Sequence, residues 1–256
     1  MLFRSRQTDA VAGTVRRATT DDATAVHQLY TEGAKSRNGQ SVRSRDFWQQ
    51  ENILGNLWVL EGESNRLDCS AVLALNDIER AQGKQIYVRE LHGASFAAQL
   101  RLIRSLAELD GIVALNLKLP AGSLFLLAFP ERFDITVNHA MALRVLDVKQ
   151  ALRHLKPPED LRAQVSFEVT DWVVDADKPL AVMVQADEGH VEVVDRVDKD
   201  ALRCDINTFT QLFAGGLTTA QAREMGGLEG GNPAIGAACD ALLCDRVPYR
   251  SWVEAG

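Results

Sequence analysis

The stretch that most constrains the fold lies between residues 138 and 153, where the spacing of apolar residues changes. Met141, Leu143 and Val145 alternate with small or charged residues, which predicts a half-buried strand. Asp147 can cap a helix, and apolar residues follow it at helical spacing, at Val148, Ala151, Leu152 and Leu155. Pro157 would end this helix, because proline has no backbone N–H to donate. We predict that this strand and helix open a second domain.

The charge distribution also divides the chain near this point. Residues 1–140 carry 16 Lys and Arg against 16 Asp and Glu, whereas residues 141–256 carry 12 against 19, so the whole net charge of −7 lies in the second part. Nucleic acid and anionic membrane surfaces need a basic footprint, so neither is expected as a partner. An acidic half would suit a cationic ligand, and it equally fits a solvated surface that aids solubility.

Composition predicts an ordinary globular protein. Hydrophobic residues make up 46% and charged residues 25% of the 256 residues. No apolar run approaches the roughly 20 residues of a membrane span, and the N-terminus does not resemble a signal peptide, so we expect no membrane span and a cytoplasmic location. The four cysteines form no C-x-x-C pair, and no histidine lies near them at the spacing of zinc ligands. We therefore predict buried thiols and no metal site.

Residues 1–12 are polar and without periodicity, so we predict a loose tail. The order of elements that follows, up to the change near residue 138, predicts an α+β domain. The expected elements are a strand at 14–18, helices at 21–30 and 46–54, strands at 57–60, 69–75 and 85–91, a helix capped by Ser95, a strand at 113–117 and a short apolar helix at 124–129. The strands at 57–60 and 69–75 flank a turn, which is typical of a hairpin.

The second part has a different order of expected strands and helices. Three alternating segments predict a meander of strands at 164–171, 179–184 and 189–194, with turns at 175–177 and 187–189. A short strand follows at 201–204, and three helices begin after Asp205, after Thr218 and at Pro233. The glycine-rich stretch 226–231 predicts a flexible loop.

Five motifs in the same order resemble the enhanced intracellular survival (Eis) acetyltransferases. In the family's middle domain they are Tyr30, Gly39, Arg43 and Phe47-Trp48, and then Glu90-Leu91-His92 before a helix that ends in residues 105–110. In its C-terminal domain they are Leu143-Arg144-Val145-Leu146-Asp147 through Leu152, residues 167–171, and Leu212-Phe213-Ala214-Gly215-Gly216. Together these motifs cover nearly all of residues 14–252.

The resemblance implies a degenerate GNAT-like domain at 13–136 and a sterol-carrier-like α+β domain with a mainly antiparallel sheet at 137–256. The family's N-terminal acetyl-CoA-binding GNAT domain is not matched. That domain carries an R/Q-x-x-G-x-G/A turn whose backbone N–H groups hold pyrophosphate, and no such pattern occurs in this sequence. We therefore expect no cofactor in this chain, and acetyl-CoA only if the N-terminal domain is present.

Site residues follow from the same resemblance. The family's C-terminal carboxylate acts as a base after an aromatic residue, which points to Gly256 and Trp252. Four residues follow Trp252, so either Gly256 supplies the carboxylate or the role is lost, as in a frayed terminus. Asp171 and Trp172, at the end of a strand, are candidates for a substrate-pocket rim, although an aspartate there is also common in turns.

Three functions remain open from the sequence. The first is that the chain forms the C-terminal two domains of an Eis-like N-acetyltransferase, non-catalytic alone and serving oligomer assembly and substrate-pocket building for a cationic amine. A piece of a longer protein and a separate short gene both fit this function. Its expected partners are copies of itself or an N-terminal GNAT domain. The second function is a sterol-carrier-like lipid or hydrophobic-ligand binding protein, and the third is a self-sufficient acetyltransferase, which the missing phosphate loop disfavours.

Overall fold

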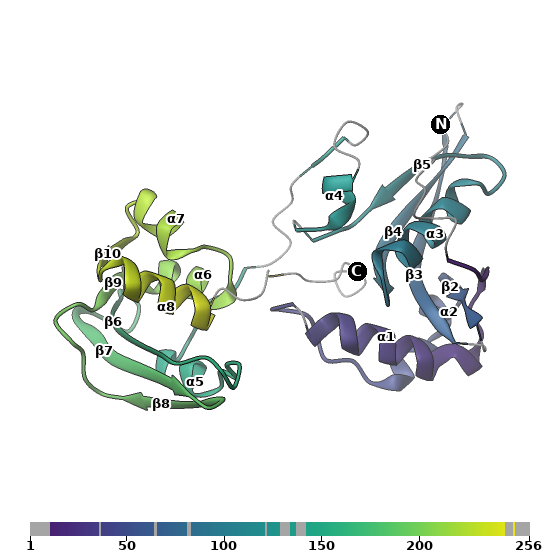
Figure 1. Cartoon of the computed structure of the whole chain (residues 1–256). Coiled ribbons are helices and arrows are strands. Elements are labelled where there is room, and N and C mark those ends of the chain that lie inside the picture. Colours follow the sequence, from purple (N-terminus) through teal and green to yellow (C-terminus); the bar gives the residue numbers. More distant parts are fainter. Residues whose placement is uncertain are drawn as a thin grey trace. The chain divides into compact units, whose positions relative to one another are not determined.

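The computed structural model describes residues 11–35, 37–63, 66–80, 83–120, 122–128, 134–136, 142–243 and 248. The chain divides into two compact units, one within residues 1–140 (unit 1) and one at Met141–Pro248 (unit 2). Figure 1 draws each unit as a sheet with its own helices. Within these ranges, no helix combines the length and the apolar character that a bilayer crossing requires.

Unit 1 is built around a five-stranded sheet in the order β1-β2-β3-β4-β5. Its elements are β1 (Thr14–Arg17), the 3₁₀-helix η1 (Thr20–Asp22), α1 (Ala23–Lys35), the 3₁₀-helix η2 (Arg45–Gln49), α2 (Glu51–Leu54), β2 (Leu57–Glu61), β3 (Leu67–Arg80), β4 (Gly83–Gly93), α3 (Phe96–Ala107), β5 (Ile112–Leu117) and α4 (Leu124–Ala128). β1 to β4 are antiparallel neighbours, and β4 pairs with β5 in parallel. A parallel pair needs a crossover, which α3 supplies.

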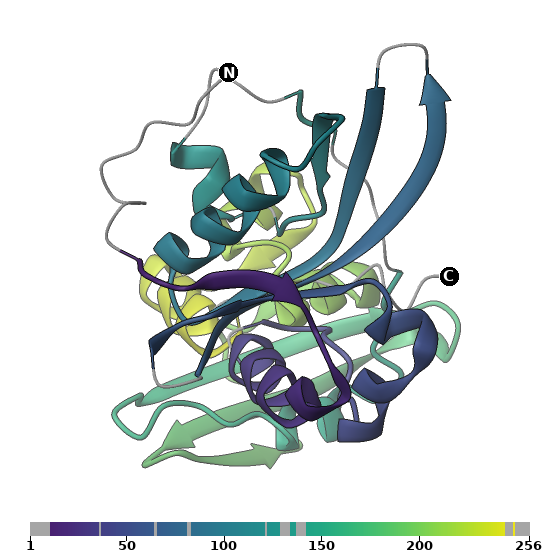
Figure 2. The same ribbon diagram turned by 90° about the vertical axis from the view of Figure 1, so that its right-hand side faces the viewer.

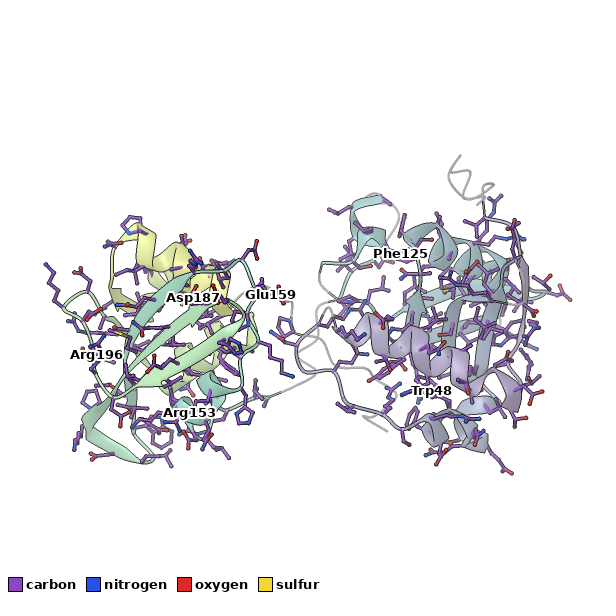
Figure 3. The ribbon with its side chains drawn as sticks, turned by 60° about the horizontal axis from the view of Figure 1, so that its bottom comes forward. Trp48, Phe125, Arg153, Glu159, Asp187 and Arg196 are labelled. Carbon is purple, nitrogen blue, oxygen red and sulfur yellow. The ribbon has the colours of Figure 1, made fainter. Side chains whose placement is uncertain are left out.

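Helices cover both faces of this sheet, as Figure 2 shows. β2 illustrates why, because its residues alternate between the two faces. Leu57 and Val59 pack with α1 and Trp48, whereas Leu60 packs with α3 and Phe125. Figure 3 labels Trp48 and Phe125, one in each of these two cores. The predicted helix at 46–54 is split at Gln50, whose backbone is extended, into η2 and α2.

Unit 2 holds a second five-stranded sheet, in the order β10-β9-β6-β7-β8. Its elements are α5 (Val148–Arg153), β6 (Ala163–Asp171), β7 (Asp175–Asp187), β8 (His190–Val194), β9 (Leu202–Asp205), α6 (Ile206–Ala214), α7 (Thr219–Glu224), β10 (Leu228–Gly230) and α8 (Pro233–Leu243). The β6–β9 pair is parallel and the other pairs are antiparallel, so the sheet is mainly antiparallel. The α+β class predicted for both parts is therefore confirmed.

One cluster of buried residues joins the inner face of this sheet to its helices. Phe167 from β6 meets Phe209 from α6 edge to face, with ring centroids 5.4 Å apart, and both side chains are fully buried. Leu152 from α5 and Cys239 from α8 belong to the same cluster. Side-chain caps fix the helix starts, since Asp147 accepts from the Gln150 N–H and Asp205 from the Thr208 N–H.

Three predictions for unit 2 are wrong. Residues 142–145 form no strand; Val145 enters the core, and its N–H donates to the buried Thr210 hydroxyl at 3.1 Å. The β6–β7 turn is at 172–174, because β7 already begins at Asp175. The stretch 226–231 contains β10, which pairs with β9. In the first case a side chain distant in sequence, Thr210, takes the place of the sheet partner that alternation implied.

Candidate functional site

A group of three ionisable side chains is buried in unit 1. Glu90 on β4 lies between the Arg43 Nη1, 2.7 Å from its Oε2, and the His92 Nε2, 2.9 Å from its Oε1. The side chains are 1%, 3% and 2% exposed for Glu90, Arg43 and His92. Ions buried this deeply are costly unless they are paired, so this group is held by its mutual contacts. We call Arg43, Glu90 and His92 the buried triad.

A β-bulge explains why two polar residues of β4 point into the core beside α1. Val72 pairs with Glu90 and the next residue, Leu73, pairs with Val88, so Arg89 is the extra residue. Ile86 and Val88, before the bulge, face the core beneath α3. After it the order reverses, and Glu90 is turned toward Arg43. Simple alternation would have placed Glu90 on the same face as Val88.

Aromatic rings enclose the Arg43 guanidinium. Its central carbon lies 4.2 Å from the ring centroid of Tyr30, 4.4 Å from that of Phe47 and 5.0 Å from that of Trp48. The Tyr30 ring also meets the His92 ring edge-on at 5.1 Å. A guanidinium over aromatic faces is attracted by the ring quadrupole, the more strongly where water is excluded. We call Tyr30, Phe47, Trp48 and Glu90 the cation cage.

Burial and charge act in opposite directions on Glu90. Burial alone would raise the pKa of its carboxyl. The hydrogen bond and charge of His92 and the Arg43 guanidinium lower that pKa by more than burial raises it, so the pKa lies below its usual range. The carboxylate is therefore ionised in the folded protein at neutral pH. It is enclosed by its partners, so the arrangement acts as an internal ion pair and not as an acid–base group open to solvent.

The strand-to-helix turn β4–α3 is one place in unit 1 where a phosphate could meet a helix N-terminus. Only Ala94 and Ser95 separate the strand from the helix, and the Ser95 hydroxyl accepts the Ala98 N–H at 3.1 Å. A Cβ on Gly93 would come 2.8 Å from Gln99 Cγ, so the turn is also tightly packed. A side chain of the protein thus already uses one of the N–H groups that a phosphate cradle needs.

The predicted rim residues Asp171 and Trp172 lie at the β6–β7 turn of unit 2. Asp171 accepts from Arg144 Nη2 at 2.6 Å and from the Val173 N–H at 2.9 Å. Partial desolvation alone would raise the pKa of Asp171. These donors lower the pKa by more than desolvation raises it, so it lies below its usual range. Trp172 is 67% exposed, beside exposed Val173 and Val174. Asp171 therefore organises a turn that presents apolar side chains to solvent.

The structure does not test the other predicted site residues. Trp252 and Gly256 lie outside the described residues. The residues of the buried triad and cation cage were part of the motifs that carried the family resemblance, yet the sequence gave no reason to join them into a site. Long-range pairing between Arg43 and Glu90 was the missing information.

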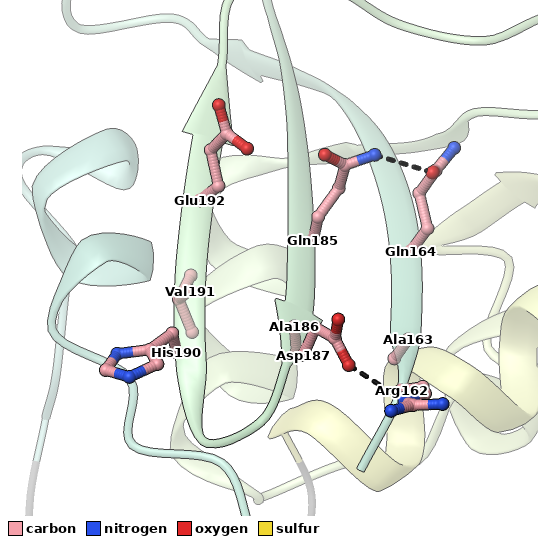
Figure 4. A pocket seen from close by; sticks show the side chains of 9 residues that line it. All are labelled: Arg162, Ala163, Gln164, Gln185, Ala186, Asp187, His190, Val191 and Glu192. Carbon is pink, nitrogen blue, oxygen red and sulfur yellow. Dashed lines mark hydrogen bonds and ion pairs between the residues drawn. The ribbon is translucent and has the colours of Figure 1, made fainter. Parts of the chain in front are cut away.

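A surface hollow of about 660 Å³ lies at the ends of β6, β7 and β8 (Figure 4). Four of its polar side chains pair with one another. Arg162 Nε is 2.8 Å from Asp187 Oδ1, and Gln185 Nε2 donates to Gln164 Oε1 at 2.7 Å. The hollow is broad and open, so its chemistry selects no ligand.

The described cysteines and acids show no metal site. Cys69, Cys204 and Cys239 are buried and not in disulfides, as predicted for these three, and Cys244 is outside the described residues. Burial raises the pKa of Cys204 to about 12 and raises that of Cys69 as well, so neither thiol is reactive. Among the residues with assigned positions, no three His, Cys, Asp or Glu side chains converge to hold a metal ion.

Residues 148–251 match the profile of the sterol carrier protein domain family. This range begins at the first residue of α5 and includes the whole second sheet. Unit 2 thus carries the predicted sterol-carrier-like domain. A comparison with curated protein sequences found no match.

Solved structures of acetyltransferases share the fold of nearly the whole chain. A GCN5-related N-acetyltransferase from Anabaena variabilis matches 95% of this chain at 16% identity with a TM-score of 0.73. Eis1 from Mycobacterium abscessus matches 97% at 18% identity with a TM-score of 0.65, and a GCN5-related N-acetyltransferase from Kribbella flavida matches 93% at 21% identity with a TM-score of 0.64. The chain spans 64%, 64% and 60% of these structures, respectively. The two-domain fold expected from the Eis resemblance is confirmed.

Proposed function

We propose that this chain supplies the middle and C-terminal domains of an Eis-like N-acetyltransferase, without catalysing acetyl transfer alone. The observation that carries the proposal is the extent of the structural match, which includes nearly all of this chain but less than two thirds of each relative. The remaining third of such an enzyme would bind acetyl-CoA. The two domains would support assembly, with copies of this chain or with an N-terminal GNAT domain, and help to form a pocket for a cationic amine.

The β4–α3 turn supports the non-catalytic part of this proposal. Acetyl transfer needs a cradle for the pyrophosphate, hydrogen-bond donors for the thioester oxygen and a base for the ammonium proton. At this turn the Ser95 hydroxyl accepts a hydrogen bond from the Ala98 N–H, and no glycine-rich loop precedes the helix. The ionised Glu90 is enclosed by Arg43 and His92, so it has no free path to a substrate amine.

Calorimetry with acetyl-CoA and a thiol-release assay with polyamines and aminoglycosides test this proposal on the full chain. We expect neither saturable micromolar binding nor turnover. The control variant is Ser95→Asp, which adds a negative charge at the turn. Saturable binding by the wild type that Ser95→Asp weakens tenfold or more would show that the turn is a working phosphate site and would refute the proposal. Sedimentation velocity over a hundredfold range of concentration tests assembly, which a chain that stays monomeric throughout would contradict.

The second candidate function is binding of a lipid or another hydrophobic ligand, which the sterol carrier protein match favours. The core residues of unit 2 instead pack against one another, with Phe167 and Phe209 fully buried in ring contact. We therefore expect organic extraction of purified protein, followed by mass spectrometry, to find no stoichiometric lipid. A reproducible one-to-one fatty acid or sterol would favour this second function.

A cytoplasmic location is part of the proposal. The buried cysteines Cys69, Cys204 and Cys239 support it, since they form no disulfide and disulfides are rare in reducing compartments. Fractionation of the producing cells tests this location.

A further inference from the structure

The cation cage of unit 1 is occupied by a side chain from an irregular surface segment. Residues Gln40–Ser44 form neither helix nor strand, and we call them the strap. Val42 is fully exposed and Ser44 is exposed, whereas Arg43 between them is buried. The strap therefore contributes the charged side chain of Arg43 to the interior of unit 1, and its Gln40 amide donates to Glu90 Oε1 at 3.5 Å.

The cage provides the groups that a free cation would need. A carboxylate lies at one side, with Glu90 Oε2 at 2.7 Å from the guanidinium, and three aromatic rings lie within 4.2 to 5.0 Å. A planar guanidinium matches both a carboxylate and an aromatic face. These groups come from α1, η2 and β4, so only the occupant of the cage belongs to the strap.

Polar atoms around the cage remain unsatisfied while Arg43 fills it. Gln40 Oε1, Trp48 Nε1 and His92 Nδ1 are buried without a hydrogen bond. Buried polar atoms of native proteins are nearly always paired, so these three atoms add a cost to the closed strap, and access to water on opening would remove that cost. The strap holds this interior closed through Arg43 and through the Tyr30 hydroxyl, which donates to the Ser41 carbonyl.

We propose that the cation cage is a binding site for the guanidinium group of a small molecule, with Arg43 as a built-in competitor on a releasable strap. Release of Arg43 leaves Glu90 buried beside three rings and without the charge of the guanidinium. An external guanidinium replaces that charge and stabilises the open strap. A ligand shifts the equilibrium between the closed and open strap only if it binds the open state more tightly. The cage is vacant only in the open state, so the ligand binds there and not in the closed state.

The test uses the full chain and methylguanidinium chloride as the probe, with sodium chloride at equal ionic strength as the reference. Arg43→Ala empties the cage, and we expect it to bind the probe saturably at millimolar concentrations by calorimetry. The wild type should bind at least tenfold more weakly, because Arg43 competes. The double variant Arg43→Ala with Glu90→Gln should lose at least tenfold in affinity, and methylammonium should bind more weakly than methylguanidinium to Arg43→Ala.

Folding of Arg43→Ala does not limit the test. If the variant is unfolded in plain buffer, far-ultraviolet circular dichroism follows the same titration, and recovery of the folded signal by methylguanidinium but not by sodium chloride supports the proposal. A folded variant without saturable binding, an unfolded variant without recovery, or equal affinity with and without Glu90 would overturn it.

Hydrogen exchange tests release of the strap in the wild type. High methylguanidinium should accelerate exchange of the amides of residues 40–44, with the amides of β6 and β7 in unit 2 as internal controls. Unchanged exchange in the strap, at a probe concentration where binding is measured, would refute the competitor role of Arg43.

Discussion

Replacing Glu90 with glutamine should selectively destabilise unit 1. The substitution keeps the shape of the side chain but removes the carboxylate charge that pairs with the buried Arg43 guanidinium. Removing one partner of a buried pair costs about 3–5 kcal/mol. With an m-value of about 2 kcal/mol per molar urea, the midpoint of the unit 1 transition should fall by roughly 2 M.

Glu168→Gln is the matched control. Glu168 pairs with Arg203 at 2.7 Å, the same distance as in the Arg43–Glu90 pair, but the side chains are 32% and 52% exposed. Exposed pairs contribute about 0–1 kcal/mol, so this variant should unfold nearly as the wild type does. Equal distances with different burial separate the effect of desolvation from that of simple pairing.

The pH dependence gives an independent check. The pKa of Glu90 is lowered in the folded protein, so its contribution to stability is present above the unfolded pKa of about 4.3 and is lost as the pH falls through the folded value. Glutamine does not titrate there. The difference in free energy of unfolding between wild type and Glu90→Gln should therefore be constant from pH 6 to 7 and shrink below about pH 4.

Urea titrations read by tryptophan fluorescence measure both variants, because Trp48 and Trp58 report on unit 1. Hydrogen exchange of β4 and β6 amides assigns each transition to its unit. A loss below about 1 kcal/mol for Glu90→Gln, or an equal loss for Glu168→Gln, would refute the reasoning that burial makes the triad costly to break.

Three further predictions concern packing and organisation. Thr210→Val should cost about 1–3 kcal/mol of unit 2 stability in urea titrations, because the Val145 N–H loses its acceptor; an unchanged midpoint would contradict this. Gly33→Ala should cost about 1–2 kcal/mol in unit 1, because its Cβ would come 2.7 Å from His92 Nδ1 while alanine recovers some helix propensity; a gain in stability would show that His92 moves freely. Limited proteolysis should give stable pieces that correspond to the predicted domains 13–136 and 137–256, and a stable fragment starting well inside 150–200 would contradict that boundary.

The caps and the strand segments were predictable because they depend on residues close in sequence. Asp147, Ser95 and Asp205 each accept an N–H three residues ahead, which sequence spacing already implies. The segment at 142–145 was mispredicted for the opposite reason. Its alternation is that of a strand, but a hydroxyl 65 positions later, on Thr210, satisfies the Val145 N–H without any sheet partner. Nothing within the segment carries that information.

The buried triad shows how one local irregularity can decide which long-range contacts form. The residue pairing places the β-bulge at Arg89, and only through it do Glu90 and His92 turn toward α1, away from the face that Val88 shares with α3. A regular strand would keep Glu90 on the α3 face, where Leu102 and Leu106 are buried and offer no counter-charge. The carboxylate would then be buried among apolar side chains, which costs far more than the ladder contact that the bulge removes. The polar interior of unit 1 therefore depends on the bulge as much as on the residues of the triad.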